Sequence, residues 1–158
     1  MNLDTIHTIA PDLEYSAEFV PWDGADKYPT LNWRVTFRTA RGKMTTSFTQ
    51  GIGHAPNYQH GRHDIDYDYY LKRIARTGRN CKGKLPAPNP ADVMCCLLSD
   101  AEAIDCACFE DWATDLGYDT DSRKVEGIYR ACLSTGLRLR MLLGEEKMTA
   151  LHELLKDL

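Results

Sequence analysis

Apolar and polar side chains alternate without interruption in the stretch Leu31-Asn32-Trp33-Arg34-Val35-Thr36-Phe37-Arg38. A period of two residues is that of a β-strand with one buried face and one solvent-facing face. A tight turn at residues 40–43 and a threonine-rich alternating stretch at 44–49 follow, which predicts a β-hairpin. Residues 14–20 alternate in part. The sequence therefore predicts a three-stranded antiparallel meander whose apolar face has to be covered by helices.

Downstream of the meander, apolar residues recur at three- and four-residue spacings, which predicts helices. A short helix is expected at 66–76, followed by a basic, proline-containing linker at 79–90. Asn89 and Pro90 are suited to the cap and the first turn of a helix that runs to about residue 103. The next helix covers 109–116, and its apolar stripe is Phe109, Trp112, Ala113 and Leu116.

A longer helix is expected over about 121–143, with Asp119 or Thr120 as its cap. The residues predicted to face the core are Val125, Ile128, Tyr129, Cys132 and Gly136. Gly144 separates this helix from a last amphipathic one around Met148–Leu155. The pattern predicts one α+β domain over residues 1–158. It begins with a three-stranded antiparallel β-meander (1–50), continues with a loop, a short helix and a basic linker (51–90), and ends with a helical part (91–158). The helical C-terminal half is expected to contain four or five helices.

The composition, with 43% apolar and 27% charged residues, is that of an ordinary globular protein. No long apolar run is present and the first residues lack a basic segment followed by an apolar one, so we expect a cytoplasmic protein without membrane spans. The six cysteines include the adjacent pair Cys95 and Cys96 and the closely spaced pair Cys106 and Cys108. These spacings do not match a zinc site, and reduced structural thiols are expected.

Three kinds of chemistry can be considered and are disfavoured. His54, His60 and His63 could hold a metal, but they lie in a glycine-rich loop without the helical spacing of a metal motif. Cys81 is the one cysteine in a basic setting, and nothing in the sequence identifies a base for it. The acidic run at 119–122 fails as a calcium loop because the required glycine and glutamate positions hold Lys124 and Arg130. We therefore expect neither an enzyme nor a cofactor or metal.

Charge is distributed unevenly along the chain. Residues 62–84 contain seven basic side chains with three tyrosines, and Tyr58 lies just before them, a mixture that nucleic-acid-binding proteins use. Residues 91–121 contain nine acidic and no basic side chains, so no pair within a helix relieves their repulsion. The overall charge of −4 and the neighbouring acids disfavour direct nucleic-acid binding, which stays the alternative hypothesis.

The acidic stretch is the strongest compositional feature, and an acidic surface accelerates association with a basic partner. Apolar side chains such as Trp112 are expected to take the core side of these helices. The carboxylates predicted to bind the partner are Asp100, Glu102, Asp105, Glu110, Asp111 and Asp115.

A family resemblance gives this partner a class. The runs Leu97-Leu98-Ser99-Asp100-Ala101, Phe109-Glu110-Asp111-Trp112, Gly117-Tyr118-Asp119-Thr120-Asp121-Ser122-Arg123-Lys124 and Tyr129-Arg130-Ala131-Cys132 stand within roughly residues 90–143. Together they resemble a family of small accessory proteins of tailed phages and prophages. The resemblance implies a non-enzymatic inhibitor of host defence, similar to anti-CRISPR proteins. Such an inhibitor would bind a basic, nucleic-acid-binding surface of a host complex such as a CRISPR-Cas effector, as a monomer or homodimer.

Overall fold

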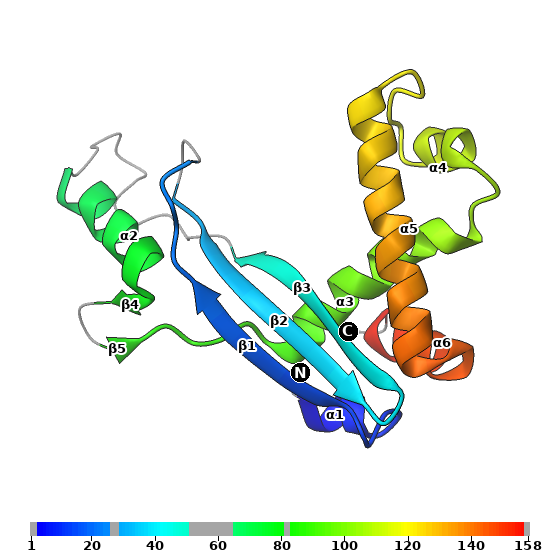
Figure 1. The fold of residues 1–158 in the computed structure, drawn as a ribbon, viewed down its shortest axis with the longest axis horizontal. Helices are drawn as coiled ribbons and strands as arrows, with labels where there is room; N and C mark the ends of the chain where they lie inside the picture. Colours follow the sequence, from blue (N-terminus) through cyan, green and yellow to red (C-terminus); the bar gives the residue numbers. More distant parts are fainter. Residues whose placement is uncertain (1–2, 26–28, 51–64, 81–82, 157–158) are drawn as a thin grey trace. The chain divides into compact units, whose positions relative to one another are not determined.

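The computed structural model of the chain describes residues 3–25, 29–50, 65–80 and 83–156. They form a three-stranded antiparallel sheet in the order β1-β2-β3 followed by a helical C-terminal half (Figure 1), which confirms the predicted α+β class. The strands are β1 (Glu14–Val20), β2 (Leu31–Thr39) and β3 (Gly42–Gln50). Alternate residues of β2 are buried, from Leu31 through Phe37 to Thr39, as the alternation predicts.

The described residues divide into two compact units, and each takes part of the sheet. The first, which we call the helical unit, consists of residues 1–14, 37–44 and 89–158. The second, the strand unit, consists of residues 15–36 and 45–88.

The strand unit is closed by α2 (Ile65–Thr77). Leu31 packs against Ile74 and Ala75 of this helix, with Phe19, Trp22 and Leu85 around them. The backbone N–H of Trp22 donates to the carbonyl of Ala75 at 2.7 Å, which ties the end of β1 to the helix. The prediction of a linker at 79–90 is wrong in its first part. There β4 (Arg79–Asn80) and β5 (Gly83–Lys84) pair as a small antiparallel ribbon.

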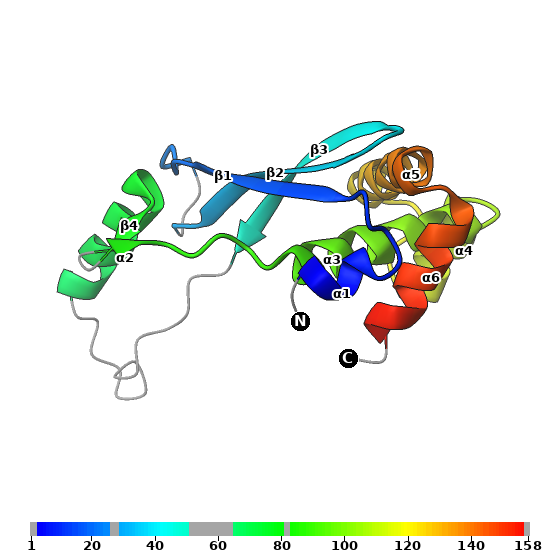
Figure 2. The same ribbon diagram turned by 90° about the horizontal axis from the view of Figure 1, so that it is seen from below.

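The helical unit contains α1 (Leu3–His7), which the sequence pattern did not predict, and α3 (Pro90–Ala101). After α3 come a 3₁₀ turn, η2 (Glu102–Asp105), and the helices α4 (Phe109–Asp115), α5 (Arg123–Leu143) and α6 (Glu145–Lys156). Figure 2 shows α1 beside the start of α3, which it contacts, and α5 contacts α3, η2, α4 and α6. The predicted cap of α3 is confirmed: the side chain of Asn89 accepts from the N–H of Ala91 at 3.0 Å, and Pro90 starts the helix.

The central helix α5 is capped differently from the prediction. Ser122 takes the cap position and its hydroxyl accepts from the N–H of Val125, at a long 3.4 Å. Asp119 instead accepts from the N–H of Asp121 in the preceding turn, at 3.0 Å. The prediction of Asp119 or Thr120 as cap is therefore wrong, although the same short polar run supplies the residue.

Long-range contacts hold the hairpin tip and the segment before β1 to the helices of this unit. The hydroxyl of Thr39 donates to the carbonyl of Leu142 at 2.9 Å, and Lys147 pairs with Asp12 at 3.0 Å. Phe37, Met94, Leu139 and Leu151 are fully buried in the unit. No helix in the described part of the chain combines the length and the apolar character needed to cross a bilayer.

Candidate functional site

The turn that ends α4 builds one wall of the site. Gly117 has a φ of 71°, its N–H donates to Thr114, and the next N–H, of Tyr118, donates to Ala113 at 2.7 Å. This is the Schellman arrangement, in which a glycine in the left-handed region ends a helix and returns the chain over it. The ring of Tyr118 therefore lies on Trp112, with the ring centroids 5.5 Å apart.

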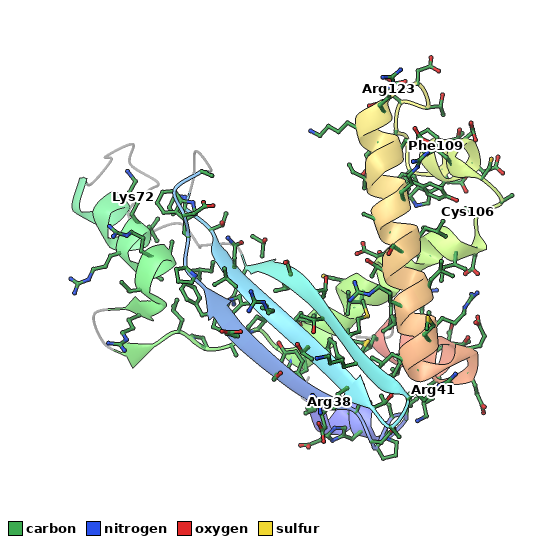
Figure 3. All side chains as sticks on the ribbon, viewed as in Figure 1. Arg38, Arg41, Lys72, Cys106, Phe109 and Arg123 are labelled. Carbon is green, nitrogen blue, oxygen red and sulfur yellow. The ribbon has the colours of Figure 1, made fainter. Side chains whose placement is uncertain are left out.

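Aromatic packing fixes α4 on α5. Trp112 is only 7% exposed and packs against Tyr129 of α5, with the ring centroids 5.3 Å apart. Phe109, labelled in Figure 3 at the start of α4, is 5.7 Å from the same tyrosine ring. The expectation that Trp112 is a core residue is confirmed.

An open cleft of about 430 Å³ lies beside this aromatic cluster, entirely within the helical unit. We call it the acidic cleft and define it by Asp100, Glu102, Asp115, Leu116, Tyr118 and Ile128. Trp112, Cys106 and Cys132 also contribute to its lining. The lining contains no lysine or arginine among the described residues.

Four of the predicted carboxylates gather around one thiol. Partial burial raises the pKa of Cys106, and the negative charges of Asp115, Asp105, Asp111 and Glu102 raise it further. Cys106 lies in the connection between η2 and α4 (Figure 3), so these carboxylates come together because the chain reverses there. All four are exposed.

The other two predicted carboxylates lie in different surroundings. Asp100 is half-buried in the acidic cleft, where burial raises its pKa while the thiol of Cys132 donates to its Oδ1 at 3.7 Å. Glu110 is exposed at the start of α4 and is not among the residues that line the cleft. Its own backbone N–H, and then Cys108, hydrogen-bond to its carboxylate and lower its pKa.

A basic side chain from a distant part of the chain contacts the acidic stretch. His152 of α6 lies with its Nε2 atom 3.2 Å from Oε1 of Glu102. Glu102 and His152 also line a smaller hollow that includes Asp105 and Arg140, the latter paired with Glu145. Of the carboxylates in the acidic cleft, Glu102 therefore already has a partner of opposite charge when His152 is protonated.

The structure also corrects two predicted core positions. Ile128 of α5 is 42% exposed and Leu116 at the end of α4 is 57% exposed. Both were expected on buried stripes, and both line the acidic cleft. The apolar side of the site was therefore missed by pattern reasoning, since the spacing of residues along a helix does not tell whether a neighbour covers them.

The thiols in the described residues are poor candidates for covalent chemistry. Burial and nearby carboxylates raise the pKa of Cys95, Cys96 and Cys106, and raise that of Cys132 to about 11. A raised pKa keeps a thiol protonated at neutral pH, whereas the thiolate is the nucleophile. Cys96 of α3 is exposed, so the expectation of a structural thiol is wrong at this position.

Within the described residues, no group of three or more His, Cys, Asp or Glu side chains is placed to hold a metal ion. The loop with His54, His60 and His63, and the segment with Cys81, lie outside the described residues. Of the basic stretch, Lys72, Arg73, Arg76 and Arg79 are exposed on the strand unit.

Replacing Gly117 with alanine tests how the cleft wall is built. A Cβ atom at this position meets nothing within 4 Å, so the cost is conformational and about 1 kcal/mol of the free energy of unfolding. Asparagine tolerates the left-handed region better, and Gly117→Asn should lose less. Urea unfolding followed by circular dichroism measures both; equal losses for the two variants would contradict the assignment of the cost to the backbone.

Comparison with known proteins places no relative beside this chain: no family model, curated protein or solved structure matches it.

Proposed function

We propose that the chain is a non-enzymatic binding protein whose helical unit docks on a basic surface of a partner protein. The observation that carries the proposal is the grouping of Glu102, Asp105, Asp111 and Asp115 around Cys106. A group of like charges attracts a surface of opposite charge and speeds association with it. Their exposure keeps them available to such a partner.

The class of partner rests on the resemblance to phage and prophage accessory proteins. It supports a host defence complex whose basic groove normally holds nucleic acid, such as a CRISPR-Cas effector. Carboxylates on an exposed surface can take the place of phosphates in that groove. The setting would be the cytoplasm of the infected host.

Reversing the charge of three grouped carboxylates tests this function. The triple variant Asp105→Lys, Asp111→Lys, Asp115→Lys should lose the partner by at least about 100-fold in affinity, because each close charge pair across an interface contributes about 1.5 kcal/mol or more. The measurement is a pull-down from host lysate with quantitative mass spectrometry, repeated on the purified partner by calorimetry. Raising the salt concentration should weaken the wild-type complex as well.

A second triple variant controls for net charge. Glu14→Lys, Glu146→Lys, Glu153→Lys changes the same number of exposed acids away from the acidic cleft and, like the first variant, moves the net charge from −4 to +2. It should retain the partner. Retention by both triple variants would show that the grouped carboxylates do not make the contact.

The alternative function is nucleic-acid binding by the basic stretch at 62–84, and one observation favours it: four of its basic side chains are exposed, on and just after α2. An electrophoretic shift assay with DNA and RNA at moderate salt decides between the two functions. Nucleic-acid binding would replace the proposed function if three results came together. DNA or RNA would have to bind clearly, and the double variant Lys72→Glu, Arg76→Glu would have to lose that binding. The triple variant with lysine at positions 105, 111 and 115 would have to retain it.

A further inference from the structure

Three large apolar side chains remain exposed inside the acidic cleft. Leu116 and Tyr118 flank the glycine that ends α4, Tyr118 is 47% exposed, and Ile128 projects from α5. Apolar side chains gathered in a hollow with a few polar groups are typical of a binding site, and about 430 Å³ lies in the usual range of about 300–1,000 Å³. An acidic surface that acted by charge alone would not need them.

Asp100 gives this hollow a specific polar requirement. Its carboxylate is half-buried, and the described residues offer it no lysine or arginine. The thiol of Cys132, which donates to it at 3.7 Å, is a weak donor. A partly desolvated carboxylate is stabilised most by a charged N–H donor, and Glu102 differs because it already contacts His152.

We propose that the acidic cleft binds an amphipathic segment of the partner protein that places an arginine against Asp100 and a large apolar side chain against Leu116 and Ile128. This inference rests on the proposed function and names the part of the partner that the cleft holds. Arginine fits better than lysine because its guanidinium is less strongly hydrated and stacks on aromatic rings such as that of Tyr118. The charge of the cleft selects the basic segment, and its apolar residues fix where that segment lies.

Three synthetic helical peptides test the inference on the full chain. The first carries arginine and leucine on one face, the second has citrulline in place of arginine, and the third has serine in place of leucine. Fluorescence anisotropy should give the first peptide an affinity at least about tenfold above each of the others, since a hydrogen bond between charged groups and the burial of a leucine side chain each contribute about that much. Equal affinities for all three peptides would overturn the inference.

Asp100→Asn, with Asp92→Asn as its control, assigns the polar contact. Both aspartates belong to α3, but Asp92 is exposed in its first turn and does not line the cleft. Asp100→Asn should weaken the arginine peptide about tenfold and leave the citrulline peptide unchanged, while Asp92→Asn should change neither. Loss of both peptides in Asp100→Asn, or of neither, would overturn the role of Asp100.

The same variant has a thermal readout that a purely structural role would not produce. Burial raises the pKa of Asp100, so at neutral pH its charged carboxylate is less favourable in the folded state than in the unfolded state. The charge therefore lowers the free energy of unfolding at that pH. The folded state gains stability as pH falls through the folded pKa. A neutral asparagine should therefore raise Tm slightly at pH 7 while it weakens binding; a lowered Tm would mark Asp100 as a structural residue.

Ile128→Ser and Leu137→Ser make a matched pair for the apolar contact. Both residues lie on α5 and are similarly exposed, at 42% and 47%, but only Ile128 lines the acidic cleft. Ile128→Ser should weaken the leucine-containing peptide about tenfold and Leu137→Ser should have no effect. Equal effects would place the peptide elsewhere.

The two levels of proposal fail in different ways. If the triple aspartate variant keeps the natural partner, the proposed function is wrong. If that variant loses the partner while Asp100→Asn and Ile128→Ser keep it, the acidic surface acts without the cleft and only the further inference is wrong.

Discussion

Replacing Trp112 with alanine should lower the free energy of unfolding by about 3–5 kcal/mol, the usual cost of removing a buried tryptophan ring. The ring is 7% exposed and packs between Tyr118 and Tyr129, so its removal leaves a cavity where α4 meets α5. Ala103 and Ala113 belong to the same buried cluster and are too small to fill it. Urea unfolding followed by far-ultraviolet circular dichroism measures the loss.

Leu116→Ala is the matched control for this loss. Leu116 is the residue that caps the C-terminal end of α4 and is 57% exposed, so its truncation should cost about 1 kcal/mol or less. A comparable loss in the two variants would mean that Leu116 is covered in solution, for example by a second copy of the chain. The concentration dependence of the melting temperature distinguishes that case.

Gly136→Ala should destabilise the helical unit by about 2–3 kcal/mol, at the upper end of the cost of overpacking. A Cβ atom at this position would lie 2.6 Å from Cδ1 of Ile104 and 2.9 Å from the Cα atom of Ala101. The isoleucine can rotate away, but the backbone of Ala101 belongs to α3 and cannot move without shifting that helix. The glycine thus lets α3 and η2 approach α5 closely.

Gly127→Ala on the same helix should have the opposite effect and raise the free energy of unfolding. An added Cβ at Gly127 meets nothing within 4 Å, and alanine is favoured over glycine inside a helix by about 1 kcal/mol. Thermal unfolding of the two variants beside the wild type gives both numbers. Stabilisation by both substitutions would show that α3 and α5 are not in close contact at Gly136.

Elements whose formation depends on a few adjacent residues could be predicted from the sequence. The alternation in β2 and the Asn89-Pro90 start of α3 are properties of a few adjacent residues, and both predictions are confirmed. The residue that caps α5 was harder to predict. Asp119 and Ser122 can both accept a backbone N–H, and the turn before the helix determines which of them does so.

Short elements and the apolar side of the cleft could not be predicted in this way. Two-residue strands such as β4 and the five-residue helix α1 are stabilised by tertiary pairing and not by their own propensity. Ile128 follows the spacing of buried α5 residues, yet it is 42% exposed and lines the acidic cleft. The contact between His152 and Glu102 joins residues that are distant in sequence, so no spacing rule could have found it.

The carboxylates can be proposed as a site from composition alone, because nine acids without a basic residue between residues 91 and 121 are unusual. Their separation into a group around Cys106, a half-buried Asp100 and an outlying Glu110 depends on how η2 and α4 turn. That turn is a property of packing and had to come from the structure.

The helical unit is assembled from three separate stretches of chain, and this has a consequence for how the protein is made. Lys147 contacts Asp12, and Leu142 contacts Thr39. These contacts cannot form until residues more than a hundred positions further along the chain have been synthesised. Contacts of such long sequence separation slow folding, because a large loop has to close before they form. During translation the hairpin tip and α1 would therefore emerge with their apolar faces uncovered, and a fragment that begins at α3 would lack the residues that complete its own core.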